Sequence, residues 1–364
     1  MGLSTVLPLA ASHRKTAAFI AVWILLLVVI LTHLAGSGSR IQAYLTRTAT
    51  YTPPRILILQ QIHSGSAPAS KRAYGTARDE VDRQAERQAL YEASVSSHRK
   101  YAEAWGYEYR VDRREWVSGA GGLHFLNKIY ALLDAVVQAL GDEQGPEWIM
   151  LTDADSLILN PSIPLHALLP HPFSPPSPHV LTPAHLEPPP LILGNQDGNG
   201  FNAGVVMFRV DPRLASFIMS MLAHESVLAA LHGSHPSDQY LFGYTIQLEE
   251  NKDVADAFYE IPMMWINEYW LDYDEGSQRI DGVEWTPQLQ VHLCNGRWWW
   301  STPDWREKIV GHADALYEEA ELLGQGNVRS GLESMEDGKK TDDAVSRWWR
   351  KRKGGIQQIT FTET

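Results

Sequence analysis

The sequence has a single cysteine, Cys294, so no disulfide bond can form within the chain. It has no Asn-x-Ser/Thr glycosylation site either, because Asn160 is followed by Pro161. Basic residues are also scarce: 31 Lys and Arg stand against 43 Asp and Glu, which gives a net charge of −12. This balance excludes nucleic acid as the expected partner, since a nucleic-acid-binding face is basic. An acidic protein that binds an anionic substrate needs local positive charge or a metal ion.

The length and composition favour one large α/β domain with appendages. The chain has 364 residues, and 44% of them are hydrophobic, which is enough for a sizeable core. Residues 55–323 are the predicted catalytic domain, and residues 324–364, which are rich in charge, are predicted to form a disordered tail.

The N-terminal segment predicts a membrane anchor. Residues 1–15 form a predicted cytosolic tail, and residues 16–35 form a predicted transmembrane signal anchor. Within the anchor, Thr16–Leu34 is almost uninterrupted apolar sequence, about 28 Å of helix at 1.5 Å per residue. A cleaved signal peptide is the main alternative. With residues 36–54 as a stem linker rich in Ser, Thr and Gly, we expect a single-pass type II protein of the Golgi membrane.

The first half of the domain alternates between strand and helix patterns. Ile56–Leu59 is an apolar, β-branched strand, and a helix is expected from about Gln84 to Trp105. Tyr107–Val111 returns as a strand, Leu126–Leu140 has one apolar helical face, and Trp148–Thr152 is a buried strand. This alternation predicts a mostly parallel sheet flanked by helices.

The second half of the domain is less regular. About eleven prolines between 161 and 190 exclude regular structure there. The glycines and asparagines between 194 and 204 predict a loop that permits close backbone approach to a ligand, with a plain hairpin turn as the alternative. Helices are expected from Pro212 to about His224, after Ser237 as the N-cap, and up to Leu323.

Two carboxylates, Asp153 and Asp155, follow the buried strand Trp148–Thr152. Side chains at this spacing point toward the same side of the strand end, where they repel each other unless a divalent cation lies between them. The alternative is that one aspartate caps the next turn and the other is solvated. His292, at the end of a short strand, would be a suitable third protein ligand, because Mn²⁺ accepts mixed oxygen and nitrogen ligands.

Six segments, in this order, make the sequence resemble glycosyltransferase family 34. This family comprises the fungal α-galactosyltransferases and α-1,6-mannosyltransferases with their plant xylosyltransferase relatives. The resemblance spans about Arg55 to Leu323, and its segments are SSHRKYAEAWGYEY, HFLNKIYALLDAV, EWIMLTDADSLILNP, GNGFNAGVVMFR, SDQYLF and VHLCNG. The resemblance implies a GT-A fold, which is Rossmann-like with a mostly parallel sheet.

The resemblance also implies roles for individual residues. Asp153 and Asp155 would hold Mn²⁺ and the donor diphosphate, with His292 as the third metal ligand. Donor binding would further involve Lys128 near the nucleotide or phosphates, with Asn202 and Gly204 beside the donor sugar and acceptor. Asp238 and Gln239 match the acidic or amide pair near the anomeric carbon. From the residues alone, a solvated helix residue is the better interpretation of Lys128, and the alternative for Asp238 is that it only favours the helix dipole.

The implied reaction is transfer of a hexose, with retention of anomeric configuration, from UDP-galactose or GDP-mannose to a glycan acceptor. Assembly with other glycosyltransferases is a further expectation. Two alternatives differ in class. An aspartyl-phosphate phosphatase would use Asp153 as nucleophile and Asp155 as acid, but its later acidic pair could only be Asp342–Asp343 in the polar tail. The other is an inactive lumenal scaffold subunit, although both aspartates are present.

Overall fold

The computed structural model describes residues 52–62, 77–118, 123–170, 188–197, 200–268, 287–293 and 305–351, apart from the side chains of 77–83, 123 and 350–351. The expected membrane anchor, nearly all of the stem, most of the proline-dense segment and Cys294 lie outside these residues. From Pro53 onward the described residues belong to one compact unit.

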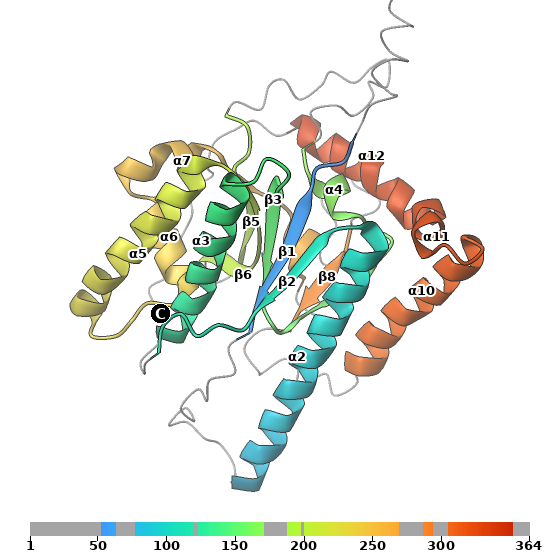
Figure 1. Ribbon diagram of the computed structural model, residues 1–364, viewed down its shortest axis with the longest axis horizontal. Helices are drawn as coiled ribbons and strands as arrows, with labels where there is room; N and C mark the ends of the chain where they lie inside the picture. The colour runs from blue at the N-terminus through green and yellow to red at the C-terminus, as the bar shows by residue number, and fades with distance from the viewer. Residues whose placement is uncertain are drawn as a thin grey trace, which may run out of the picture. The chain divides into compact units, whose positions relative to one another are not determined.

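A six-stranded mixed sheet forms the centre of the domain (Figure 1). Its strand order is β2-β1-β3-β6-β5-β7. The pairs β1–β2, β1–β3 and β5–β7 are parallel, whereas β6 runs antiparallel to both β3 and β5. The expected α/β class with a mostly parallel sheet is therefore confirmed. The strands are β1 Ile56–Gln61, β2 Glu108–Asp112, β3 Trp148–Thr152, β5 Ile192–Asp197, β6 Gly200–Arg209 and β7 Phe258–Glu260.

Alternation along the strands divides the core into two layers. In β1, Ile56 and Ile58 pack on one face of the sheet with helices from the two ends of the domain, and Leu57 and Leu59 pack on the other. The first face is covered by α2 Ala77–Trp105, α10 His312–Leu323, α11 Val328–Ser334 and α12 Glu336–Lys351. The second is covered by α3 Leu126–Leu140, α5 Pro212–His232 and α6 Asp238–Ile246.

Short elements complete the described part of the chain. A second, two-stranded sheet pairs β4 Ser156–Ile158 antiparallel with β8 Gln290–His292. The remaining short helices are η1 Leu123–Phe125, α4 Leu165–Leu168, η2 Glu249–Asn251, α7 Lys252–Asp256, α8 Met263–Ile266 and the π-helical turn η3 Arg306–Gly311.

Most predicted helices of the domain are present, and two of the expected boundaries are confirmed residue for residue. The apolar stripe of α3 faces the sheet over the predicted span, and the Ser237 hydroxyl caps α6 by accepting from the Tyr240 amide. The helices α2 and α5 are longer than expected, starting at Ala77 and ending at His232.

The prediction of a loop between 194 and 204 was wrong, and the hairpin alternative is correct. Residues 192–197 and 200–209 form the antiparallel strands β5 and β6. Gly200 opens the second strand with φ of 98°, which only glycine adopts readily. Glycine and asparagine content therefore marked a tight turn between strands.

The prediction of a disordered tail after residue 323 was also wrong for residues 324–351, which include α11 and α12, whereas residues 352–364 lie outside the described residues. Trp348 and Trp349 of α12 are buried, and their rings lie 5.0 Å from Trp265 and 5.8 Å from Tyr259, respectively. The Trp349 indole also donates to the Leu168 carbonyl at 3.2 Å. The domain therefore extends through α12, because this helix supplies part of the core.

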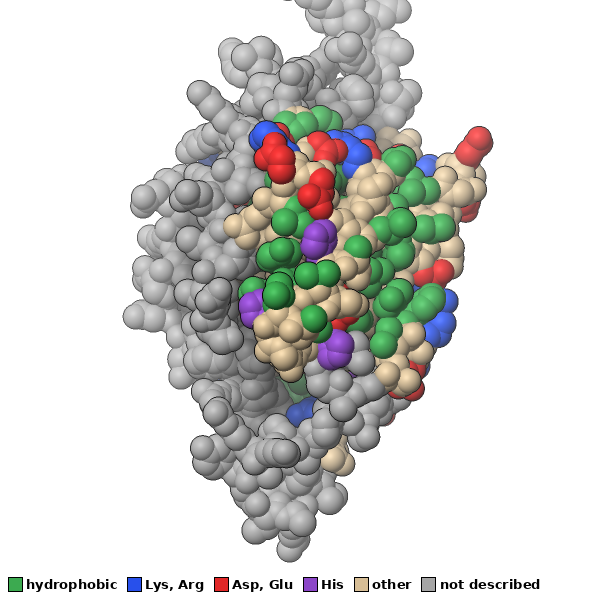
Figure 2. Space-filling model, turned by 90° about the vertical axis from the view of Figure 1, so that its left-hand side faces the viewer, with side chains coloured by type: hydrophobic (Ala, Val, Ile, Leu, Met, Phe, Trp, Pro, Cys, Tyr) green, Lys and Arg blue, Asp and Glu red, His purple; other side chains and the backbone are tan. Residues whose placement is uncertain are grey.

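The helix α5 is the one helix in the described part of the chain that is long and apolar enough to cross a membrane. One of its faces packs against the sheet through buried residues such as Phe217 and Ile218. Its outer face exposes Met219, Val227 and Leu231. Figure 2 shows this side of the molecule, where hydrophobic and uncharged side chains predominate away from the charged upper edge.

Candidate active site

The Asp-x-Asp turn lies where β3 ends, and hydrogen bonds hold both sides of it. The Asp153 amide donates to the Gly204 carbonyl on the neighbouring strand β6 at 2.8 Å. The Asp153 carbonyl accepts from the Gln60 amide at 3.0 Å and from the Ser156 hydroxyl at 2.8 Å. Because the backbone is fixed on two sides, the two carboxylates are carried by a rigid turn.

A buried polar network supports this turn from the side of α2. The Gln60 amide donates to the Ser94 hydroxyl at 2.7 Å, and Ser94 donates to the Ser156 carbonyl at 2.5 Å. The Tyr109 hydroxyl donates to Gln60 Oε1 at 2.7 Å. Both polar atoms of Gln60 are thus satisfied although its side chain is fully buried.

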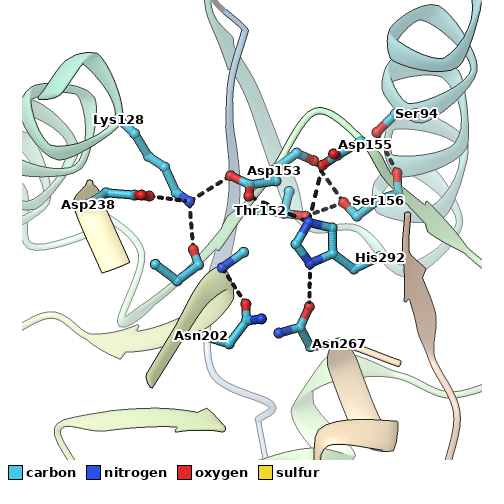
Figure 3. A network of polar contacts seen from close by, with 12 residues as sticks. Ser94, Lys128, Thr152, Asp153, Asp155, Ser156, Asn202, Asp238, Asn267 and His292 are labelled. Atoms are coloured by element: carbon cyan, nitrogen blue, oxygen red, sulfur yellow. Dashed lines mark hydrogen bonds and ion pairs between the residues drawn. The ribbon is translucent and has the colours of Figure 1, made fainter. Parts of the chain in front are cut away.

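Pairing between β4 and β8 brings His292 to the aspartates. Ser156 lies opposite His292 in this small sheet. As a result, His292 Nε2 lies 3.2 Å from Asp155 Oδ1 and 3.6 Å from Asp153 Oδ2 (Figure 3). Residues 153, 155 and 292, predicted as a metal-binding set, are therefore brought together.

The other ring nitrogen of His292 orients the imidazole. Asn267 Nδ2 donates to Asn195 Oδ1 at 2.9 Å, which leaves Asn267 Oδ1 as the acceptor for His292 Nδ1–H at 2.8 Å. This bond directs Nε2 toward the carboxylates. Metal-binding histidines generally have such a partner on the second nitrogen.

The electrostatics of the three residues favour a cation. Burial raises the pKa of Asp153 above its usual value, against the effects of Lys128 and His292, and Asp155 adds to the increase. Burial acts to lower the pKa of His292, but the Asp155 carboxylate raises it on balance. The negative charges of the two aspartates thus favour a positive charge between them.

The donor set fits a divalent metal ion. The ligand atoms of Asp153, Asp155 and His292 all lie within 4.8 Å of one another. Two carboxylates and one imidazole are a suitable set for Mn²⁺ and related ions.

Gly204 lies directly behind the His292 ring. A Cβ atom on Gly204 would be 2.1 Å from His292 Cε1 and 2.4 Å from Nδ1. The absence of a side chain at this position is what allows the ring to pack against β6. Gly204, predicted to lie beside the donor, thus packs against the predicted metal ligand His292.

Lys128 joins two parts of the site. Its ammonium group donates to Asp153 Oδ1 at 2.6 Å and to the Ala203 carbonyl at 2.6 Å, and it forms an ion pair with Asp238 Oδ2 at 2.8 Å (Figure 3). Burial opposes the charge on Lys128, but Asp153 and Asp238 raise its pKa on balance. All three N–H groups are engaged, so the solvated alternative for this residue is wrong.

Asp238 and Gln239 form the first turn of α6, and Asp238 is directed toward Lys128. Asn202 bonds within its own hairpin: its Oδ1 accepts from the Gly204 amide at 2.8 Å, and its Nδ2 donates to Asp197 at 2.7 Å. The predicted site residues thus lie on α3, β6, the α6 N-terminus, β8 and the Asp-x-Asp turn.

Sequence reasoning missed the supporting residues Gln60, Ser94 and Asn267. Gln60 could have been identified from the sequence, because it is a polar residue at the end of the apolar strand ILILQQ. Ser94 could also have been identified, since it falls on the buried face of a helix. No sequence feature pointed to Asn267, because residues 269–286 separate it from β8.

Comparison with known proteins identifies the family. A sequence profile of the galactosyl transferase GMA12/MNN10 family matches residues 75–295, more than half of the chain. The protein therefore belongs to this glycosyltransferase family, and it is a transferase. The phosphatase alternative is excluded accordingly, and its required acidic pair lies on helix α12. A search of curated protein sequences finds no match.

The solved structures found by comparison are distant. A glycosyltransferase involved in glycosylation of the PBCV-1 major capsid is 13% identical, covers 66% of this chain and 95% of its own, and has a TM-score of 0.43. Mouse xyloside xylosyltransferase 1 in its apo form is 12% identical, with coverages of 67% and 98% and a TM-score of 0.33. GlyE of Streptococcus pneumoniae TIGR4 is 11% identical, with coverages of 84% and 66% and a TM-score of 0.34.

Proposed function

We propose that this protein is a retaining hexosyltransferase that uses Mn²⁺ to move galactose or mannose from UDP-galactose or GDP-mannose to a hydroxyl of a glycan. The observation that carries this proposal is the convergence of Asp153, Asp155 and His292 at the carboxyl end of β3. Family membership supports the transfer chemistry, and the choice of hexose and the retention of configuration follow from the resemblance to galactosyl- and mannosyltransferases.

In this proposal, Asp153, Asp155 and His292 hold the metal, and Asn267 keeps the imidazole in the orientation that binding requires. Bound there, Mn²⁺ supplies positive charge that offsets the charge developing on the departing diphosphate. Lys128 fixes the carboxylates of Asp153 and Asp238 relative to each other.

Asp238 and Gln239 are the proposed catalytic residues near the anomeric carbon. The Lys128 ammonium lies 2.8 Å from Asp238 Oδ2, and the position at the α6 N-terminus also favours a negative charge. Asn202 and Gly204 line the donor-sugar side in this proposal, through the strand β6 that also contacts His292.

The proposed location is the Golgi membrane, with a single-pass type II anchor at residues 16–35, and the protein acts there with other glycosyltransferases. Support for the location comes from the apolar N-terminal run alone. A protease-protection assay on microsomes that contain the full chain tests the orientation: cleavage of the catalytic domain in sealed vesicles would contradict it.

Donor turnover by the full-length protein in detergent tests the activity. The assay offers a panel of UDP- and GDP-sugars, with mannosides as acceptors, in Mn²⁺ or EDTA. We expect one donor to be consumed, only with Mn²⁺, and Asp155→Asn to abolish that turnover. Asp256→Asn is the matched control and should retain activity. Asp256 is also an aspartate, but it forms an exposed ion pair with Lys252 and is not among the predicted site residues. Equal turnover in EDTA, or an active Asp155→Asn variant, would contradict the proposal.

A further inference from the structure

A diphosphate bound at this site needs cationic or hydrogen-bond-donating partners besides the metal. The two aspartates already carry negative charge. Lys128 is not available to a ligand, because its three N–H groups are engaged at 2.6, 2.6 and 2.8 Å by Asp153, Ala203 and Asp238. The charge of Lys128 is balanced by carboxylates of the protein. Another helix or strand must therefore supply the cationic or hydrogen-bond-donating side chains that bind the phosphates.

The helix α2 lies along the Asp-x-Asp turn. The Ser97 hydroxyl accepts from the Ile158 amide at 2.9 Å, and the Ser94 hydroxyl donates to the Ser156 carbonyl at 2.5 Å. The helix and β4 thus advance in the same direction, and the preceding turn of α2 lies beside residues 153–155. Figure 1 shows that the N-terminal half of α2 extends past the carboxyl ends of β1 and β3, where the site is.

The side chains on this face of α2 are Tyr91 and Arg87. Tyr91 is three residues before Ser94 and Arg87 is four residues before Tyr91, so the three lie on one helical face. Tyr91 is half-buried and Arg87 is exposed. The carboxylate charges of Asp155 and Asp153 and the guanidinium charge of Arg87 all affect the pKa of Tyr91, so the Tyr91 hydroxyl lies within electrostatic range of both the metal-binding turn and Arg87.

The environment keeps Tyr91 protonated. Burial, followed by the Asp155 carboxylate, raises the pKa of Tyr91 to about 12. The hydroxyl is therefore a hydrogen-bond donor at neutral pH, as an anionic ligand requires.

We propose that Tyr91 and Arg87 bind the diphosphate of the nucleotide-sugar donor on the α2 side of the Asp153–Asp155 turn. The Tyr91 hydroxyl donates to a phosphate oxygen, and Arg87 supplies the positive charge that Lys128 cannot. Arginine suits this task because its planar guanidinium can form two hydrogen bonds to a phosphate. This inference rests on the proposed function, since it assumes a nucleotide-sugar donor at the Asp153, Asp155 and His292 cluster.

Calorimetric titration of the full-length protein in detergent tests the inference, with UDP and GDP as probes in the presence of Mn²⁺ and with Mn²⁺ alone. We expect Tyr91→Phe and Arg87→Met each to weaken binding of the recognised nucleoside diphosphate by about tenfold or more, as for hydrogen bonds to charged groups. Affinity for Mn²⁺ alone should stay within about twofold of the unaltered protein. The loss caused by Arg87→Met should shrink at high salt, because Arg87 is exposed.

Arg99→Met is the matched control. Arg99 is also exposed on α2, but its charge affects the pKa of Tyr109 and not that of Tyr91. Its replacement should therefore leave the nucleotide affinity unchanged. Unchanged nucleoside diphosphate affinity in both site variants would overturn the inference. A parallel loss of affinity for Mn²⁺ alone would overturn it too, since α2 would then support the metal ligands only. If the unaltered protein binds neither nucleotide, the proposed function itself fails.

Discussion

Replacing Gly204 by alanine tests whether the packing of β6 against His292 sets the metal site. The added Cβ would lie 2.1 Å from His292 Cε1 and 3.0 Å from Asn202 Oδ1. Carbon atoms in contact are normally about 3.5–4.0 Å apart, so the ring or the strand must move by roughly 1.5 Å. The imidazole is 5% exposed and bonded to Asn267, so it has little room to move.

Either displacement damages the metal site. Movement of the ring takes Nε2 away from Asp155, and movement of the strand takes with it the Gly204 carbonyl that accepts from the Asp153 amide. Overpacking of this kind costs about 1–3 kcal/mol of stability. By analogy with the loss of a residue that orients a metal ligand, we expect Mn²⁺ affinity to fall by about 10–100-fold.

Gly194→Ala is the matched control, because it adds the same methyl group to the same hairpin. Its Cβ would meet the Phe201 ring at 2.9 Å and the Phe258 ring at 3.2 Å, so the nearest atoms belong to core aromatic rings and not to metal ligands. Mn²⁺ titration by calorimetry and thermal unfolding should show a loss of stability in both variants and a loss of Mn²⁺ affinity in Gly204→Ala alone. Equal Mn²⁺ affinities in the two variants would refute the reasoning.

Three further predictions concern stability. Lys128→Met should lower the unfolding free energy by about 3–5 kcal/mol in denaturant titrations, because it removes a buried cation and leaves two partly buried carboxylates without their partner; a change below about 1 kcal/mol would contradict the central role of this ion pair. Burial raises the pKa of Glu268 to about 7 from a usual 4.5, so its ionisation disfavours the folded state as pH rises through this range. Glu268→Gln should therefore match the unaltered protein near pH 4 and be more stable by up to about 3 kcal/mol above pH 7 when unfolding is measured in EDTA; a pH-independent difference would contradict this. Trp348→Ala should cost about 3–5 kcal/mol, whereas Leu322→Ala, at a side chain that is 81% exposed, should change stability by less than about 0.5 kcal/mol; similar values for both would show that α12 contributes little to the core.

Local patterns were sufficient for the elements that have strong periodicity. The stripe of Ile129, Leu132 and Val136 predicted α3 because these residues face the sheet at helical spacing. The helix α12 was missed because its sequence is mostly charged. Its buried residues Val345 and Trp349 are four apart, but they are surrounded by Asp, Arg and Lys, so composition indicated disorder.

The residues of the site could be predicted from the sequence, but the contacts between them could not. Asp153 and Asp155 were recognisable by their position after a buried strand. Their contact with His292 depends on pairing between two strands of three residues each, too short to carry a register signal in sequence. The bond of Lys128 to Asp238 likewise depends on how α3 and α6 pack together, which neither helix reveals by itself.

The burial of α12 has a consequence for biosynthesis. The same hydrophobic cluster contains Ile56 from the first strand and Trp349 from the last helix. Domains generally fold from the N-terminus during synthesis, but here part of one face of the sheet stays uncovered until α12 has been made. Completion of the fold must therefore wait for the synthesis of α12, and premature termination before α12 should yield a protein that chaperones retain.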